Sequence, residues 1–595
     1  MENQSIWGLI KYRLMNLFGL QRPEPEPTKV QQTHTETHKS NIDTMSNPIS
    51  DYTWKNTSQT LTATPGTFYQ ASDKDDLINI VKDAVSNGKK VRVTGGRHSW
   101  YPLVMTDEDV DGGTLKGSDF CLIDVSAMKT ITKEKTDAGL YLVNIEPGAT
   151  MGDLEQATMG EWPDNPAPDP LVALPTNGVI PTELQIGGFV GAGCHGTGWD
   201  QPTIPDLIYS VEMILVDENK NVTVRTFSEE NEDDPMDVIR VNLGTMGIMT
   251  KITLKGEPLF CIHGTDTTDT LMSDVISRQP DASNHPLKDL VEDEDVNYLE
   301  LFWFPFNESK TDLELRLLPD LEKTKVWKKM GKALKNEEGT ISPDCPRDVP
   351  SQVWDNLETK FGKFVYTEIA KMSSGNVLEN ATVEGLLKLM SFMAYKQATD
   401  DYIAPATRFY HYQKSAFPVL DFSFAIPMDA STDPYYDVIS KAWYAVVDAV
   451  DEYARTKEHF YERYPVNVTL HARFIKNSQS VLSPAYQPAG SETHTCWIEF
   501  LSGSPTPDAP DEDWYQNYMA TWQEFCKLIG QKWIDLGGRP HWAKEWQILD
   551  TPEINIYQKL QDMYGDNLTQ FKTLRDQLDP TETFLYSWTE KIFQG

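Results

Sequence analysis

The fold of this chain is decided by the stretch Val91-Arg92-Val93-Thr94-Gly95-Gly96-Arg97-His98-Ser99-Trp100. Its first four residues predict a short strand. The glycine pair that follows has no Cβ atoms, so the backbone can turn sharply there and bring its N–H groups close to an anionic ligand. We therefore expect a strand followed by a loop that can hold a dinucleotide pyrophosphate.

The segment in front of this strand predicts a helix. Ser72 is placed to cap its start, and Gly88 is placed to end it. Between them, apolar residues recur at the spacing of one helical face. These residues are Leu77, Ile80, Val81, Ala84 and Val85.

A second glycine-rich stretch runs from Gln185 to Gly198. Strand packing also uses glycine, but it does not need glycines at this density. We therefore expect the backbone to approach a ligand closely here, with Ile186, His195 and Thr197 in the same run. The glycines are Gly187, Gly188, Gly191, Gly193, Gly196 and Gly198.

Four separated segments, in this order, give the chain a family resemblance: Gly95–Trp100, Leu174–Gly198, Leu243–Thr250 and Gly538–Lys544. The chain resembles the FAD-binding oxidoreductases of the vanillyl-alcohol oxidase or p-cresol methylhydroxylase type. Within that type it is similar to the sugar-alcohol and aldonolactone oxidases. The resemblance extends from about Trp54 to the C-terminus.

The resemblance implies an FAD cofactor bonded covalently to the ring of His98. It also implies that Arg97 and Ser99 donate to the pyrophosphate and that Gly247 and Ile248 contact the flavin through their backbone. Taken alone, His98 would more often be a capping or core histidine and Arg97 a solvated charge. The implied cofactor-binding residues are Gly95, Gly96, Arg97, His98, Ser99, Ile186, Gly187, Gly188, Gly191, Gly193, His195, Gly196, Thr197, Gly198, Gly247 and Ile248.

The implied catalytic residues are His471, Arg473, His541 and Lys544. Similar lactone and polyol oxidases carry a Glu-x-Arg pair that faces the flavin, and this chain has His471 in place of the acid. A histidine can act as a base or donate a hydrogen bond, but it never carries a negative charge. We expect His471 to assist proton loss from the substrate, with His541 as the next candidate, and Lys544 to stabilise the reduced flavin.

Composition restricts the partners of the protein. The 595 residues carry a formal net charge of −36, which disfavours nucleic-acid backbones and anionic membranes. The six cysteines form no C-x-x-C pair and predict neither a disulfide scaffold nor a zinc site. We expect a soluble protein, cytoplasmic by default. Residues 6–20 could form a targeting segment or an amphipathic helix with weak membrane contact.

The predicted fold class is α+β, with an FAD-binding domain and a substrate domain built on an antiparallel sheet covered by helices. We expect a flexible extension over residues 1–53, the FAD-binding domain over 54–258, the substrate domain over 259–540, and a segment over 541–595 that returns to the FAD domain. Residues 321–406 are expected to insert helices over the active site. The aromatic run Phe302-Trp303-Phe304 is expected in the core.

The resemblance predicts an FAD-dependent oxidase that transfers hydride from an alcohol carbon of a small polar substrate, sugar-derived or a lactone, to the flavin. Dioxygen is the expected acceptor, with hydrogen peroxide as the product. Three alternatives stay open: oxidation of a larger apolar alcohol such as a sterol, a specialised biosynthetic oxidation, and a non-catalytic flavin-binding protein.

Overall fold

The computed structural model describes residues 45–106, 117–180, 182–314, 316–335, 377–396, 398–411, 418–491, 493–504 and 512–594. The chain divides into two units, residues 1–44 and 45–595, and only the second is described. The targeting segment or amphipathic helix expected at residues 6–20 therefore lies outside the described residues. Within them, no helix has both the length and the apolar character that crossing a membrane requires.

The predicted strand-and-loop segment belongs to a small parallel sheet in the order β3-β5-β4. Helix α2 (Lys74–Ser86) packs on it through the predicted apolar face. Asp73, not Ser72, caps α2, because its side chain accepts from the backbone N–H of Asp76 at 2.9 Å. The three strands are β3 (Thr67–Gln70), β4 (Lys90–Thr94) and β5 (Phe120–Asp124).

A second sheet has six antiparallel strands, of which five follow the order β12-β11-β13-β7-β6, and β10 pairs with β13. Two short helices of this region are α3 (Met151–Thr158) and α4 (Ile186–Gly191). The strands are β6 (Ile131–Lys135), β7 (Tyr141–Ile145), β10 (Val172–Ala173), β11 (Ile208–Val216), β12 (Val222–Ser228) and β13 (Ile248–Pro258).

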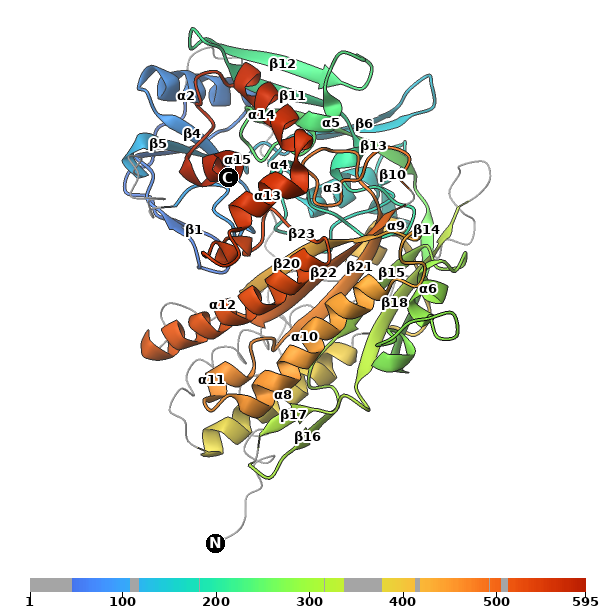
Figure 1. The fold of residues 1–595 in the computed structure, drawn as a ribbon. Helices are drawn as coiled ribbons and strands as arrows, with labels where there is room; N and C mark the ends of the chain where they lie inside the picture. Colours follow the sequence, from blue (N-terminus) through green and yellow to red (C-terminus); the bar gives the residue numbers. More distant parts are fainter. Residues whose placement is uncertain are drawn as a thin grey trace, which may run out of the picture. The chain divides into compact units, whose positions relative to one another are not determined.

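The third sheet has eight strands in the order β19-β14-β18-β15-β21-β22-β20-β23, and all of its pairs are antiparallel. Helices α10 (Asp437–Thr456) and α12 (Glu512–Asp535) lie along it (Figure 1). The strands are β14 (Cys261–Leu271), β15 (Tyr298–Trp303), β18 (Lys325–Leu334), β19 (Tyr402–Pro405), β20 (Val419–Met428), β21 (Thr469–Lys476), β22 (His494–Gly503) and β23 (Arg539–Pro540).

Side-chain alternation gives this sheet two different faces. Phe422 and Phe500 point to the helical side, where their rings lie 5.9 and 5.5 Å from the ring of Trp533 on α12. Their neighbours Asp421 and Glu499 therefore point to the opposite face. Polar groups thus gather on the face that the helices leave uncovered.

Shorter elements connect the sheets, and part of the expected helical insertion is strand. Within residues 321–406 the described elements are β18, β19 and α8 (Val377–Tyr395), together with the start of α9, whereas residues 336–376 lie outside the described part. The remaining short elements are β1 (Trp54–Lys55), β2 (Thr62–Ala63), β8 (Gly160–Glu161), β9 (Asn165–Pro166), α5 (Met236–Ile239), α6 (Pro286–Val291), β16 (Ser309–Thr311), β17 (Leu317–Pro319), α9 (Ala406–Tyr410) and α11 (Phe460–Arg463).

The C-terminal segment lies beside the first sheet. It forms α13 (Ile556–Tyr564), α14 (Asp566–Leu578) and α15 (Ser587–Gln594), seen in red near β4 in Figure 1. The N–H of Val91 in β4 donates to the carbonyl of Thr583 at 2.8 Å. The segment between α14 and α15 thus lies against the strand that leads into the first glycine loop.

One described cysteine is disulfide-bonded, in a chain for which the sequence predicted no disulfide scaffold. Cys261 on β14 is disulfide-bonded, whereas Cys121, Cys194, Cys496 and Cys526 are free thiols. The wide spacing of the cysteines gave no signal for this bond.

Arg92 holds three distant segments together. It is 5% exposed, and its guanidinium donates only to backbone carbonyls, without a carboxylate partner among the described residues. Because a guanidinium has five N–H donors in a fixed fork, each donor finds one acceptor. The acceptors are the carbonyls of Val104 at 3.1 Å, Gly244 at 2.6 Å, Phe584 at 2.8 Å and Leu243 at 3.2 Å, together with that of Leu103.

Replacing Arg92 should therefore destabilise the fold. Arg92→Met leaves buried carbonyls without donors, and hydrogen bonds to a charged group contribute about 1.5–3 kcal/mol each. We expect the midpoint of thermal unfolding to fall by roughly 5 °C or more. The matched control is Arg97→Met, because Arg97 is exposed and its side chain bonds only Tyr52 at 3.0 Å. Equal shifts in the two variants would contradict the role of Arg92.

Candidate active site

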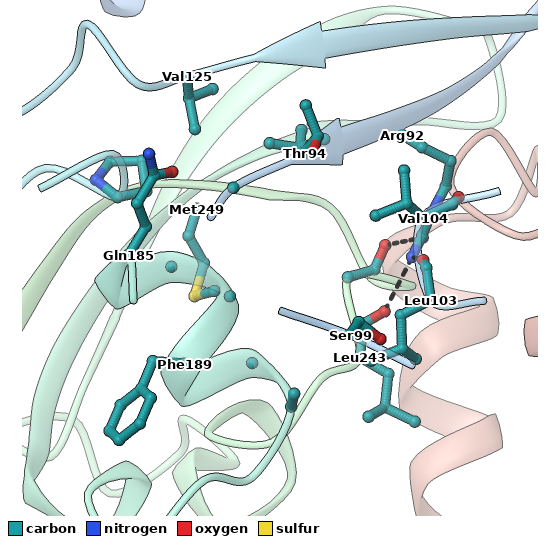
Figure 2. Close-up of a pocket in the computed structure, with 18 of the residues that line it drawn as sticks. Arg92, Thr94, Ser99, Leu103, Val104, Val125, Gln185, Phe189, Leu243 and Met249 are labelled. Atoms are coloured by element: carbon teal, nitrogen blue, oxygen red, sulfur yellow. Dashed lines mark hydrogen bonds between the residues drawn. The ribbon is translucent and has the colours of Figure 1, made fainter. Parts of the chain in front are cut away.

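The first glycine loop, α4 and the loop before β13 enclose a cavity, called here the glycine-lined cavity. Figure 2 shows Arg92 and Thr94 of β4 on one side of it and Gln185 and Phe189 of the α4 region on the other. Ten of the expected cofactor-binding residues line it: Gly95, Gly96, Arg97, His98, Ser99, Gly187, Gly188, Gly191, Gly247 and Ile248.

The lining of this cavity suits a dinucleotide cofactor. A Cβ atom added to Gly188 would meet no atom within 4 Å, so the backbone there borders open space. The Oε1 atom of Gln185 is buried and has no hydrogen-bond partner in the described part of the chain. A buried polar atom is rarely left unpaired, so Gln185 is placed to bind a ligand that fills the cavity. FAD offers both donors and acceptors to such an amide.

The other expected cofactor-binding residues of the second glycine stretch do not line this cavity. A Cβ atom on Gly196 would lie 2.0 Å from Oγ1 of Thr176, and Thr197 donates its hydroxyl to the carbonyl of Leu299 at 3.0 Å. These residues pack one chain segment against another. Packing, and not the expected contact with a ligand, therefore explains the glycines among them. The residues placed in this way are Ile186, Gly193, Gly196, Thr197 and Gly198.

The side chains of Arg97 and Ser99 are engaged by neighbouring protein groups. Arg97 has a φ of 64° and is exposed, with its guanidinium bonded to the hydroxyl of Tyr52. Ser99 donates its hydroxyl to the carbonyl of Tyr101. The expectation that these two side chains donate to phosphate is therefore not supported by their contacts, although both residues line the cavity.

A second cavity adjoins the first one over the polar face of the eight-stranded sheet, and it is called here the charged cavity. His98, Cys194 and Ala543 line both cavities. All four expected catalytic residues line the charged cavity, and so does His195, which was expected at the cofactor. Its polar lining includes Asp421, His471, Arg473, Glu499, His541 and Lys544, and its aromatic lining includes Trp100, Phe302, Phe304 and Trp327.

His98 lies where the two cavities meet. Its Nε2 atom is 2.7 Å from Oε2 of Glu183, a residue that the sequence analysis missed. With Nε2 engaged as a donor to this carboxylate, the lone pair of the neutral ring lies on Nδ1.

His471 is not placed to act as a base. Its Nδ1 atom lies 2.9 Å from Oε1 of Glu499, and its Nε2 atom lies 3.0 Å from Oε2 of Glu300. Both ring nitrogens lie within hydrogen-bond distance of carboxylate oxygens, so neither is open to a substrate hydroxyl. The ring also stacks on Phe302 with centroids 4.0 Å apart. The contacts of His471 therefore do not favour it as the group that removes the proton.

Glu499 supplies the carboxylate that the sequence analysis did not find at position 471. It accepts from Arg473 at 2.9 Å on the neighbouring strand. Burial alone would raise the pKa of Glu499, but Arg473 and the hydrogen bond from His471 outweigh burial and hold it well below its usual range. A carboxylate and an arginine thus face the cavity together, with the acid on a different strand from the one expected.

Lys544 forms an ion pair with Asp421, and its ammonium lies 4.4 Å above the ring of Trp100. Burial raises the pKa of Asp421 to about 6, although Lys544 opposes this shift. Burial lowers the pKa of Lys544, but Asp421 and Glu499 more than compensate, so its pKa lies above the ordinary value. Lys544 is therefore cationic at neutral pH.

Two further histidines of the charged cavity are neutral. Burial, followed by the charge of Lys544, lowers the pKa of His541 to about 3. Burial, followed by the charge of Arg473, lowers the pKa of His195 well below its usual range. Neither imidazole carries a charge at neutral pH, in contrast to the charged pairs beside them.

Comparison with known proteins gives two family matches. The FAD binding domain family matches residues 65–220, and the D-arabinono-1,4-lactone oxidase family matches residues 252–592. The L-gulonolactone oxidase of Mus musculus is 23% identical over 552 residues, which cover 91% of this chain and 98% of the mouse protein. The L-gulono-1,4-lactone dehydrogenase of Mycobacterium tuberculosis is 22% identical over 548 residues, with coverage of 91% and 98%.

Among solved structures, a solvent-stable cholesterol oxidase has a TM-score of 0.68 at 15% identity, covering 91% of this chain and 97% of that protein. This likeness confirms the expected α+β fold with an FAD-binding and a substrate domain. The two family matches confirm the expected resemblance and make the protein an FAD-dependent oxidoreductase. Because the second match spans more than half of the sequence, the chain belongs to the D-arabinono-1,4-lactone oxidase family.

Proposed function

We propose that the protein oxidises a CH–OH group of a sugar-derived lactone that lies in the charged cavity, with FAD in the glycine-lined cavity. The observation that carries this proposal is the Arg473–Glu499 pair on the wall of a cavity that adjoins the glycine-lined one. When bound, FAD supplies the acceptor for the hydride. The family match and the lactone-oxidising relatives support this substrate class.

The polar side chains of the charged cavity match the groups of a lactone. Glu499 accepts hydrogen bonds from hydroxyls, and Arg473 donates to hydroxyl or carbonyl oxygens. His541 accepts from the backbone N–H of Ala543 through Nδ1 at 3.0 Å, so its neutral ring presents an Nε2–H donor. Together these groups orient a small polyhydroxylated ring in the charged cavity, toward the residues that line both cavities.

The cofactor would be held chiefly by backbone at Gly95, Gly187, Gly188 and Gly247, and by the amide of Gln185. We propose dioxygen as the electron acceptor, as in the relatives named oxidases. A sterol is less well suited, because the charged cavity would bury four charged side chains against an apolar ring system.

The substrate proposal is tested by anaerobic reduction of the purified flavoprotein. Aldonolactones should bleach the flavin absorbance, and admission of air should restore it with release of hydrogen peroxide. Cholesterol should leave the spectrum unchanged. Bleaching by sterols but by no lactone would contradict the proposal, and recovery of colour only with an artificial acceptor would contradict the role of dioxygen.

We propose that Nδ1 of His98 is bonded to the C8 methyl group of the flavin. The contact of Nε2 with Glu183 favours this bond because it leaves the Nδ1 lone pair free. Its formation is a two-electron oxidation: the methyl group and the imidazole each lose one hydrogen, and dioxygen takes both up as hydrogen peroxide.

After precipitation with acid, the yellow colour should stay with the wild-type protein, and a flavin-bearing peptide should contain His98. His98→Ala should release all of its flavin under the same treatment, while Arg97→Met, from the same loop, should keep it. Free FAD in the wild-type supernatant would overturn the covalent bond.

Lys544 should accelerate flavin reduction, because a fixed cation near the flavin stabilises the negative charge that develops there. Lys544→Met should slow anaerobic reduction by roughly a hundredfold, the effect of losing one preorganised donor. Lys591→Met is a matched control, because Lys591 also pairs with a carboxylate, Asp550 at 2.6 Å, and lies 4.6 Å above a ring, that of Tyr557. Its rate should equal that of the wild type.

The Asp421 pair adds a pH dependence. As the pH falls through about 6, Asp421 takes up a proton and no longer neutralises Lys544. The loss of a negative charge near the flavin should raise its reduction potential in this range, and Asp421→Asn should remove the change. A reduction potential without this pH-dependent change would contradict the role of the Asp421–Lys544 pair. Equal reduction rates for Lys544→Met and Lys591→Met would show that Lys544 has only a structural role.

A further inference from the structure

We propose that His195 accepts the hydroxyl proton when the substrate is oxidised, an inference that rests on the proposed function. His195 was expected to bind the cofactor, but it lines the charged cavity and not the glycine-lined one. The structure therefore places an imidazole on the wall of the charged cavity, at a position that the sequence assigned to the flavin.

The hydrogen bonds of His195 fix its tautomer. Nδ1 lies 2.9 Å from the carbonyl oxygen of Gly196, and because a carbonyl can only accept, Nδ1 carries the hydrogen. In a neutral ring the lone pair is then on Nε2. No described residue is hydrogen-bonded to Nε2, so this lone pair is available to a substrate hydroxyl.

Of the other histidines that line the charged cavity, His541 and His471 offer no free acceptor nitrogen, and the Nδ1 lone pair of His98 is the one proposed above to form the flavin bond. His541 uses the Nδ1 lone pair to accept the N–H of Ala543, and Nε2 carries the hydrogen. Both ring nitrogens of His471 are engaged by carboxylates, Glu499 and Glu300. His195 and His541, with ring centroids 5.9 Å apart, thus have opposite tautomers, one offering an acceptor and the other a donor.

The surroundings keep His195 neutral before the reaction and hold its ring in place. The ring stacks on Trp497 with centroids 4.0 Å apart and an interplanar angle of 6°. Burial, Arg473 and His541 favour the neutral ring, while Glu499 lies on the same cavity and favours the charged one. Glu499 would therefore stabilise the imidazolium once His195 has taken the proton.

The step balances in atoms and charge. The carbinol carbon loses a hydrogen with two electrons, which passes to FAD, and the hydroxyl loses its proton to Nε2 of His195. The C–O bond becomes a carbonyl, and His195 becomes an imidazolium. Hydrogen peroxide formation later consumes a proton, so the imidazolium can return to the neutral form within one turnover.

The tautomers can be measured without any substrate. In holoenzyme labelled with ¹⁵N-histidine, long-range ¹H–¹⁵N spectra distinguish Nδ1–H from Nε2–H rings, and His195→Gln and His541→Gln assign the two signals. We expect the Nδ1–H tautomer for His195 and the Nε2–H tautomer for His541 at pH 7. A charged His195, or an Nε2–H tautomer for it, would overturn the proposal even if no lactone proved to be a substrate.

A kinetic test uses His195→Asn, whose amide can still donate to the carbonyl of Gly196 but has no atom in the place of Nε2. Anaerobic reduction by a reactive lactone should slow by about a hundredfold or more, the usual loss when a general base is removed. The covalently bound flavin content should equal that of the wild type. Unchanged reduction rates, or loss of flavin from this variant, would show that His195 serves the cofactor or the fold.

If no lactone reduces the wild-type enzyme, the substrate proposal fails. The tautomer measurement still shows whether Nε2 of His195 can accept a proton. If lactones reduce both forms at the same rate, the substrate proposal stands and His195 is not the base. The two failures are therefore distinguishable.

Discussion

A buried, ionised carboxylate needs a cation or hydrogen-bond donors beside it, and the contacts of Glu499 with Arg473 and His471 meet this constraint in the charged cavity. Removing Arg473 would take the cation away from a buried carboxylate, and breaking a buried ion pair in this way typically costs about 3–5 kcal/mol. The pair also depends on the register of β21 and β22, because a shift by one residue would turn Glu499 toward α12. The same strand register therefore determines which side chains pack under α12 and which line the charged cavity.

The two cavities differ in the groups that line them. Backbone and small side chains line the glycine-lined cavity, and Arg92 joins three of its segments through their carbonyls. The charged cavity is lined by side chains from strands that are far apart in sequence but adjacent in the sheet. Because His98 and Ala543 line both, a cofactor and a substrate would meet at a fixed boundary.

The sequence predicted the elements that local patterns determine. The strand before Gly95 and the glycines on the cavity wall are where the pattern places them. The acid partner of Arg473 was not predictable in the same way, because Glu499 lies 28 residues from His471 and meets it only through strand pairing. A signal was nevertheless present: Glu300, Asp421 and Glu499 are single carboxylates in otherwise apolar strand segments, which points to a buried functional role. The glycines at 193, 196 and 198 could not be distinguished from their neighbours, because packing and ligand contact both select glycine.

The most direct test of the central claim is a crystal structure of the FAD-loaded protein, reduced under anaerobic conditions and soaked with an aldonolactone. We expect the isoalloxazine ring to lie beside His98 and the lactone to lie in the charged cavity, with one of its hydroxyls within hydrogen-bond distance of Glu499 and Arg473. A lactone bound outside the charged cavity, or a flavin ring remote from His98, would contradict it.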